Sequence, residues 1–201
     1  MLQRQGFLFF LISIMLSNIS LVCRDVILEF KGANFLPTNP TFKDAYGGGA
    51  LYGPELSVQL YEDAKWYVFT SADYFKRDGK CLSVADAKTL RLVPLALGIK
   101  YITPVRDWAD FYLGLGFQPE YINIKSHRRC VTTKNTQWAF GGIGKSGIYI
   151  QLPHHLLIDL FIDFSFVKTH HTNALYGHTM ICSKAKLNGA IFGGGLGYRF
   201  N

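Results

Sequence analysis

Polar and apolar residues alternate along much of this chain. The final segment shows the pattern most clearly, because residues two apart share one face of an extended strand. Its large side chains fall on one face, at Phe192, Leu196, Tyr198 and Phe200. The glycines 193, 195 and 197 fall on the other face with Ile191 and Arg199. The chain therefore ends in a strand with one apolar side.

The same alternation predicts eight strands in all. They cover residues 25–34, 50–62, 65–77, 88–103, 109–125, 138–152, 155–168 and 188–200. The connections alternate between short ones, at 63–64, 104–108 and 153–154, and long ones, at 35–49, 78–87, 126–137 and 169–187. Short turns at one end and long loops at the other are typical of an eight-stranded antiparallel up-and-down transmembrane β-barrel.

The charges of each strand gather on one face. In 156–168, for example, the apolar face carries Ile158, Leu160, Ile162, Phe164 and Phe166, and the opposite face carries Asp159, Asp163 and Ser165 with Phe161. Segments 54–62, 65–75 and 110–120 repeat this division. Alternation alone fits two arrangements, a membrane barrel with its apolar face outside and a soluble sandwich or lipocalin-like barrel with that face inside.

Composition favours the membrane barrel. Charged residues make up only 17% of the chain and aromatic residues 15%, whereas soluble domains carry about 25% charged residues. The polar faces combine small residues with isolated charges, which suits a narrow eight-stranded interior. We therefore expect a lumen charge network of Glu29, Lys31, Glu55, Asp73, Lys100, Glu120, Lys145, Asp159, Asp163 and Arg199. Two aromatic girdles are expected, Trp66, Tyr101, Trp108, Tyr198 and Phe200 on the turn side and Tyr52, Tyr74, Tyr121 and Trp138 toward the loops.

The N-terminus has the features of an export signal. Arg4 precedes the apolar run 6–16, which is too short to span a bilayer comfortably, and a more polar stretch follows. We predict a signal peptide at 1–23 and a barrel domain at 24–201. Lipidation at Cys23 is a minor alternative, because Leu21 and Val22 precede it where small residues would be expected.

Three stretches carry a family resemblance: LRLVPLALGIKY (90–101), DFYLGLGFQPEY (110–121) and the terminal GGGLGYRF. With the signal peptide, they resemble the small outer-membrane β-barrel proteins of the OmpA, OmpX and OmpW type. The resemblance implies a location in the bacterial outer membrane. It also implies that Tyr198 and Phe200 form a signal for the barrel assembly machinery, although Asn201 follows Phe200 at the end of the chain.

The segment KSHRRCVTTKNTQ (125–137) is rich in bases and covers the third long loop with its approach. Lys125, Arg128, Arg129 and Lys134 are expected to form a basic surface loop. Such bases pair well with the phosphates of lipopolysaccharide or with an acidic host polymer, and a merely solvated loop is the alternative. A nucleic acid is not an expected partner of an exported barrel.

The cysteines and histidines predict little chemistry. Cys81, Cys130 and Cys182 fall in three different long loops, so one disulfide is conceivable in any of three pairings, with an odd thiol left over. The loop histidines lack the spacing of a metal site, so we expect no metal and no cofactor.

An enzyme is not expected. Ser165, Asp163, His170 and His171 are close in sequence, but no GxSxG motif accompanies them. The leading hypothesis is a structural or surface-interaction barrel with long extracellular loops and a lumen filled by paired charges, since an unpaired buried charge costs several kcal/mol. The alternatives are a narrow passive channel for small or apolar solutes, a lipid-modifying enzyme and a secreted lipocalin-like binder.

Overall fold

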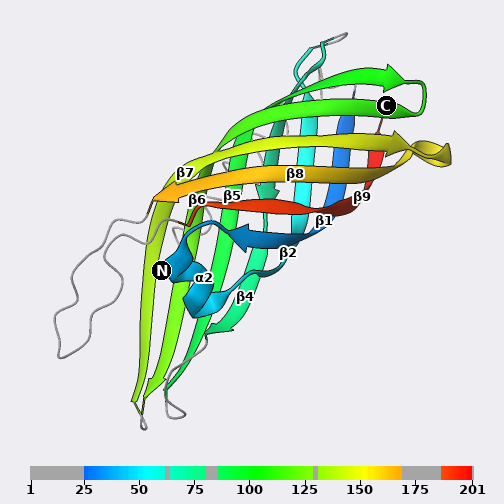
Figure 1. Ribbon diagram of the computed structural model, residues 1–201. Helices are drawn as coiled ribbons and strands as arrows, with labels where there is room; N and C mark the ends of the chain where they lie inside the picture. Colours follow the sequence, from blue (N-terminus) through cyan, green and yellow to red (C-terminus); the bar gives the residue numbers. More distant parts are fainter. Residues whose placement is uncertain (1–24, 62–63, 80–85, 129–130, 169–186, 201) are drawn as a thin grey trace, which may run out of the picture.

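The computed structural model describes residues 25–61, 64–79, 86–128, 131–168 and 187–200. These residues form one sheet of nine strands and two short helical segments (Figure 1). The elements are β1 (Val26–Pro37), α2 (Pro40–Tyr46), β2 (Gly49–Gln59), β3 (Trp66–Ala72), β4 (Tyr74–Gly79), β5 (Asp86–Arg106), β6 (Ala109–Arg128), β7 (Val131–Gln151), η1 (Pro153–His155), β8 (Leu156–Lys168) and β9 (Gly189–Phe200). No helix of these residues is long and apolar enough to cross a membrane.

The sheet closes into an eight-stranded antiparallel barrel. With β3 and β4 counted as one strand, each strand pairs with the next along the chain, and β1 pairs with both β2 and β9, so the first and last strands close the barrel. β3 and β4 act as one strand, because both pair with β2 on one side and β5 on the other. The predicted fold class is therefore confirmed.

The interruption between β3 and β4 lies at Asp73. Its amide still donates a hydrogen bond to the carbonyl of Pro94. Pro54 on β2 and Pro94 on β5 flank the interruption, and proline cannot donate a ladder hydrogen bond. Two proline-weakened neighbours therefore account for the break in an otherwise continuous strand.

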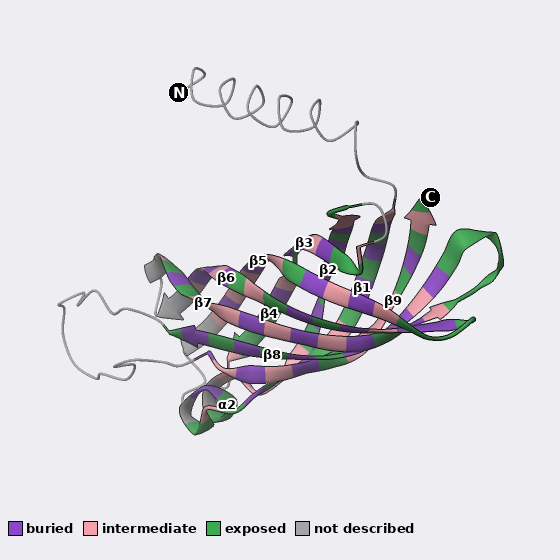
Figure 2. Cartoon of the chain, turned by 90° about the horizontal axis from the view of Figure 1, so that it is seen from above, coloured by how far each residue is buried: buried purple, intermediate pink, exposed green. Residues whose placement is uncertain are grey.

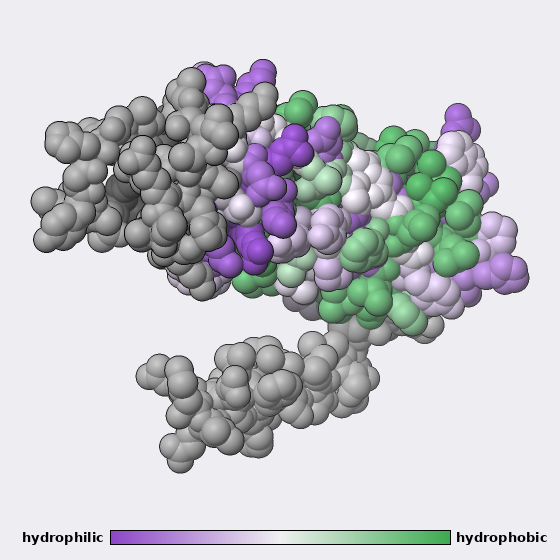
Figure 3. Space-filling model, turned by 90° about the horizontal axis from the view of Figure 1, so that it is seen from below, coloured by the Kyte–Doolittle hydropathy of each residue, from purple (hydrophilic) through white to green (hydrophobic). Residues whose placement is uncertain are grey.

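The apolar face of each strand points outward. Figure 2 shows buried and exposed residues alternating along the strands. On β8, Leu160 and Phe166 are 52% and 60% exposed, whereas Asp159 and Asp163 are 0% and 3% exposed. The apolar side chains form a band with hydrophilic side chains on both sides of it (Figure 3). This arrangement is the reverse of a soluble lipocalin, which would have an apolar interior.

Aromatic side chains mark both edges of the apolar band. At the short-turn end, Trp66 contacts Tyr101 with ring centroids 5.0 Å apart, and Tyr198 contacts Phe200 at 4.6 Å. At the loop end, the corresponding contacts are Tyr52 with Tyr74 at 5.8 Å and Tyr121 with Trp138 at 5.3 Å. Both sets follow the sequence prediction, and such belts lie at membrane–water interfaces.

The interior changes character along the barrel axis. The lumen-facing charges gather nearer the short turns, where Ile27, Ile102 and Leu157 are also buried, and apolar side chains predominate at the loop end. There, Phe42 of α2 packs edge-on against Phe35, which also contacts Phe75. The same cluster contains Leu51, Leu90, Leu92, Ile122, Val167, Leu187 and Ile191. The helix α2 therefore covers the loop end of the interior with an aromatic side chain.

Several predicted boundaries were wrong. The expected loop 126–137 is the end of the β6–β7 hairpin, in which Lys125 lies directly opposite Lys134. Its polar residues suggested a loop, but Val131 and the threonines at 132, 133 and 136 favour strand. The expected loop 35–49 contains the end of β1 and α2, whose helical turn the alternation could not predict. β5, β6 and β7 also continue beyond their predicted ends and are the longest strands of the barrel.

Some predicted features lie outside the described residues. These are the signal peptide 1–23, Cys81, Cys130, Cys182, Arg129, His170 and His171. Arg128 and Lys134 lie in β6 and β7, but the structure does not describe their side chains.

A candidate functional site inside the barrel

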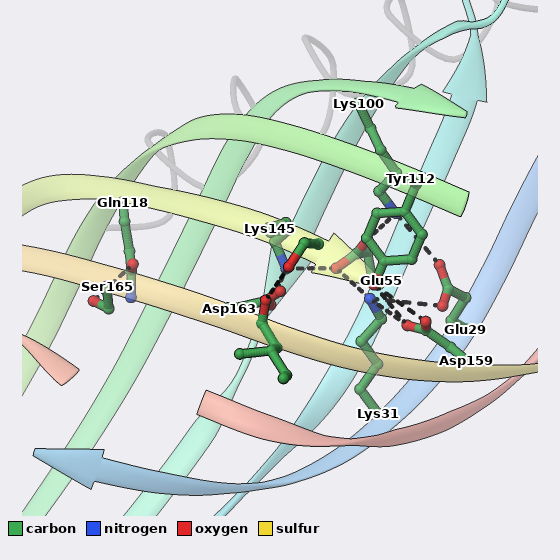
Figure 4. A network of polar contacts seen from close by, with 12 residues as sticks. Glu29, Lys31, Glu55, Lys100, Tyr112, Gln118, Lys145, Asp159, Asp163 and Ser165 are labelled. Atoms are coloured by element: carbon green, nitrogen blue, oxygen red, sulfur yellow. Dashed lines mark hydrogen bonds and ion pairs between the residues drawn. The ribbon is translucent and has the colours of Figure 1, made fainter. Parts of the chain in front are cut away.

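Charged side chains from five strands meet inside the barrel (Figure 4). They occupy the inward positions of β1, β2, β5, β7 and β8, where strand alternation turns polar residues away from the apolar outer face. The members are Glu29, Lys31, Glu55, Lys100, Lys145, Asp159 and Asp163, and we call them the lumen network. Seven of the ten residues expected in the lumen are thus brought together.

Glu55 lies at the centre of the lumen network. Its carboxylate is 2.7 Å from the ammonium nitrogen of Lys145 and 3.1 Å from that of Lys31. It also accepts a hydrogen bond from Lys100. All four side chains are at most 6% exposed. One carboxylate therefore interacts with three buried lysines.

The remaining carboxylates of the lumen network also lie beside its lysines. Lys31 is 2.9 Å from Asp159 and 3.6 Å from Glu29, and Lys145 is 3.3 Å from Asp163. The lumen network thus sets three lysines against four carboxylates. Because a buried unpaired charge is strongly unfavourable, each group depends on its partners.

Two tyrosines connect the network across the barrel. Lys100 donates to the Tyr149 hydroxyl over 2.7 Å, and that hydroxyl donates to Glu29 over 2.7 Å. Tyr112 donates to Asp159 over 3.1 Å, and the two phenol rings lie 4.7 Å apart. Sequence analysis missed both tyrosines. Their positions in the sequence could have predicted that they face the lumen, because each tyrosine shares the inward face of its strand with a charged residue.

Arg199 lies in a separate cluster at the short-turn end. Both terminal nitrogens of its guanidinium are 3.1 Å from one oxygen of Asp110, and its Nε is 3.4 Å from Asp25. Asp25 also accepts a 2.6 Å hydrogen bond from the hydroxyl of Tyr67. Gln151 donates to the same oxygen of Asp110 over 2.9 Å. This cluster ties β9 to β6 and to the residue that precedes β1, so it spans the seam of the barrel.

Two predicted lumen residues stand apart from the network. Glu120 is 4% exposed, and among the described residues it has no ion pair. Asp73 lines a small lumen cavity together with Lys145 and Asp163, but it forms no ion pair within the described part of the chain.

Ser165 does not contact an acid–base partner in the described residues. Its hydroxyl donates to the amide oxygen of Gln118 over 3.0 Å, away from the charge network (Figure 4). Nucleophilic catalysis requires a base beside the hydroxyl. The side chains that a hydrolase hypothesis would add, His170 and His171, lie outside the described residues.

The lumen network leaves little free space. The small cavity beside Asp73 has a volume of about 20 Å³, which is enough for about one water molecule. Lys31, Lys145 and Asp163 reach its wall. The arrangement can therefore hold the opposite walls of the barrel together, and the cavity that these described side chains line is too small for a substrate.

Solved structures with the same arrangement of strands are known. The outer-membrane protein OprG of Pseudomonas aeruginosa matches with a TM-score of 0.62 and 16% sequence identity, over 90% of this chain and 97% of that one. The chain has the fold of a small outer-membrane β-barrel. Ail of Yersinia pestis, in complex with the heparin analogue sucrose octasulfate, matches with a TM-score of 0.52 and 10% identity, over 88% and 98%.

The N-terminal barrel domain of OprF from Pseudomonas aeruginosa is also similar to this outer-membrane β-barrel. It matches with a TM-score of 0.50 and 15% identity, over 88% of this chain and 98% of that one. No protein-family model and no curated protein sequence matches the chain. At these identities the likeness establishes the fold alone.

Proposed function

We propose that this chain is a bacterial outer-membrane protein whose barrel is a closed structural support and whose extracellular strands and loops act at the cell surface. Residues 1–23 direct export in this proposal, and residues 24–201 form the barrel. The observation that carries the closed-barrel role is the contact of Glu55 with Lys31, Lys100 and Lys145, which crosses the lumen and leaves room for about one water. An eight-stranded interior is just wide enough for side chains to fill.

Fractionation of cells that express the full chain tests the location. The expected result is a protein in the outer-membrane fraction whose gel mobility changes on boiling. A soluble periplasmic product would overturn the proposal.

Conductance in planar bilayers tests the closed lumen. The refolded protein is expected to give no steady current, whereas a variant that shortens the crossing side chains, Lys31→Ala with Lys145→Ala, is expected to give short openings. Steady current from the unaltered protein would contradict a structural role and favour the channel.

We further propose an acidic partner outside the cell for Lys125, Arg128, Arg129 and Lys134. Strand pairing supports part of this proposal, because it sets Lys125 opposite Lys134 beyond the loop-side aromatic girdle. The similar barrel of Ail is known in complex with a sulfated heparin analogue. Binding of the purified protein to immobilised heparin, compared between Lys125→Gln/Lys134→Gln and the charge-matched Lys43→Gln/Lys65→Gln, tests it. Equal retention of both variants would contradict it.

A passive channel for apolar solutes is the second candidate. The apolar loop end of the interior, with Phe35, Phe42 and Phe75, favours it. Such a channel requires α2 and the aromatic cluster to move aside. A Phe42→Ala variant that speeds uptake of an apolar fluorescent solute into vesicles would support it, and an unchanged rate would argue against it.

A further inference from the structure

The strands that extend beyond the loop-side aromatic girdle carry an ordered polar row on their outer face. Lys76 on β4 lies opposite Arg91 on β5, Arg91 lies opposite Asn123 on β6, and Asn123 lies opposite Thr136 on β7. The next row outward contains Asp78, Thr89, Lys125 and Lys134 in the same strand order. We call these eight positions the outer-wall polar rows.

The rows lie at a defined height relative to the membrane. Tyr74 is two residues from Lys76, and Tyr121 is two residues from Asn123, so the aromatic girdle is the neighbouring row on the same outer face. Because aromatic girdles mark the headgroup level, the polar rows begin where the headgroups of outer-leaflet lipids lie.

The charge pattern of the rows is unusual for an antiparallel sheet. Lys76 and Arg91 occupy directly opposite positions on β4 and β5. Like charges in directly opposite cross-strand positions destabilise a sheet. The carboxylate of Asp78 accepts a 2.8 Å hydrogen bond from Thr89, and it is the only acid in the two rows. An anion between the facing cations would remove the repulsion.

Two polar atoms in the first row also lack partners. The Nε of Arg91 and the amide oxygen of Asn123 are shielded from solvent, and neither has a hydrogen-bond partner among the described residues. The first atom is a donor and the second is an acceptor. A ligand that satisfies both must carry an anionic acceptor and a hydroxyl donor close together.

We propose that the first of the outer-wall polar rows, formed by Lys76, Arg91, Asn123 and Thr136, binds the phosphorylated sugar headgroup of an outer-leaflet glycolipid. Lys76 and Arg91 hold the phosphate, since guanidinium and ammonium groups form strong charge-assisted hydrogen bonds with phosphate oxygens. A sugar hydroxyl donates to Asn123, and the acyl chains lie against the apolar wall below the girdle. The proposal rests on the proposed outer-membrane location and names residues and a lipid chemistry for it.

The test uses the refolded full chain in zwitterionic detergent micelles and a fluorescent bisphosphorylated lipid A as the probe. The variant Lys76→Gln/Arg91→Gln removes two charges from the first row. Lys43→Gln/Lys65→Gln removes two charges from exposed positions elsewhere, on α2 and in the β2–β3 turn. Heat-modifiable gel mobility verifies that each variant is folded.

We expect the Lys76→Gln/Arg91→Gln variant to bind lipid A at least tenfold more weakly and the Lys43→Gln/Lys65→Gln variant to bind like the unaltered protein. Dephosphorylated lipid A should bind weakly to all three proteins, and added salt should weaken binding of the phosphorylated lipid. The proposal would be overturned if the two variants bound lipid A equally well. It would also be overturned if the unaltered protein bound dephosphorylated lipid A as tightly as the phosphorylated lipid.

Two further probes identify the source of the phosphate. Phosphatidylglycerol at equal concentration should compete less well than lipid A, because it lacks the sugar. Inorganic phosphate at millimolar concentration should compete poorly, because it lacks the acyl chains. Complete competition by inorganic phosphate would show a free-anion site instead of a lipid site.

A protein that binds lipid A in micelles but fractionates away from the outer membrane would refute the proposed location and leave the lipid site intact.

Discussion

The carboxylate of Glu55 lies 2.7 Å from the ammonium nitrogen of Lys145, although the two residues are 90 positions apart in the chain. β2 and β7, which carry them, face each other across the closed barrel, because three strands separate them in either direction around the ring when β3 and β4 are counted as one. The interior is narrow enough for two side chains to meet in its middle. Because the barrel is this narrow, charged side chains form ion pairs across the lumen as well as between neighbouring strands.

Replacing Glu55 with glutamine should destabilise the barrel. The substitution keeps the shape but leaves Lys31, Lys100 and Lys145 with one carboxylate fewer, and breaking a buried ion pair costs about 3 to 5 kcal/mol. Urea unfolding in lipid vesicles, followed by tryptophan fluorescence, measures the loss.

The matched control is Asp107→Asn, which removes an exposed carboxylate at the β5–β6 turn. It should change the free energy of unfolding by less than about 0.5 kcal/mol. If both variants unfold at the same urea concentration, the lumen network does not hold the barrel together.

Glycine 147 should tolerate no side chain, whereas Gly144 on the same strand should. A Cβ on Gly147 would lie 2.6 Å from the hydroxyl of Tyr112 and 2.7 Å from the carbonyl oxygen of Leu160, but a Cβ on Gly144 would meet nothing closer than 3.9 Å. Overpacking of this kind costs about 1 to 3 kcal/mol. Gly144→Ala faces outward and should stabilise by about 0.5 kcal/mol, since alanine is better than glycine in a strand.

The same urea unfolding measurement compares the two alanine variants. An additional effect is expected for Gly147→Ala, because displacement of Tyr112 breaks its hydrogen bond to Asp159. Equal stability of the two variants would mean that the inward position has room that the structure does not show.

Alternation was sufficient to predict which face of each strand carries charge, since a period of two needs only local sequence. It placed Asp159 and Asp163 inward and Leu160 and Ile162 outward, as the structure has them. It could not predict that Glu55 lies at the centre of the lumen network. Which inward residues meet depends on the stagger between strands and on the barrel diameter, and both are set by all eight strands together.

Local signals also failed where two propensities compete. The segment 131–137 mixes β-branched residues with polar ones, and pairing with β6 decided in favour of strand. The Arg199 cluster was missed as a separate unit because Asp25 and Asp110 lie near strand ends, where burial cannot be judged from one strand alone.

Replacing Arg199 with lysine should loosen the seam of the barrel. Arginine reaches Asp110 with two nitrogens and Asp25 with a third, whereas the single nitrogen of lysine cannot reach both carboxylates. The expected loss is about 1 to 2 kcal/mol, the range for hydrogen bonds to charged groups. The temperature at which the folded band disappears on gels measures it.

The control for the seam is Arg106→Lys, at the exposed end of β5. This variant should melt like the unaltered protein. A lowered melting temperature for both arginine variants would point to a general preference for arginine instead of a specific clamp.

Phe200 should matter for assembly more than for stability. Its ring is 50% exposed on the outer face of β9, and Phe192 on the same face is 42% exposed, so the two make similar contributions to the apolar wall. If the terminal aromatic is a signal for the assembly machinery, Phe200→Ala should slow the appearance of the folded form in cells severalfold, and Phe192→Ala should not. Pulse labelling with heat-modifiable gel mobility measures both rates, and equal rates would remove Phe200 from that role.

Substitutions in the turn between β7 and β8 should increase the stability of the barrel. His154 and His155 both adopt positive φ angles, of 65° and 63°, which residues other than glycine and asparagine rarely adopt. Replacing them with asparagine and glycine should stabilise the barrel by about 1 kcal/mol, because these residues adopt that conformation readily.

His155→Ala is the control, since it loses the ring contact with Tyr198 yet keeps the unfavourable φ. Urea unfolding should rank the His154→Asn/His155→Gly variant above the unaltered protein and His155→Ala at or below it. The reverse order would show that the histidine rings stabilise the turn more than the backbone conformation costs.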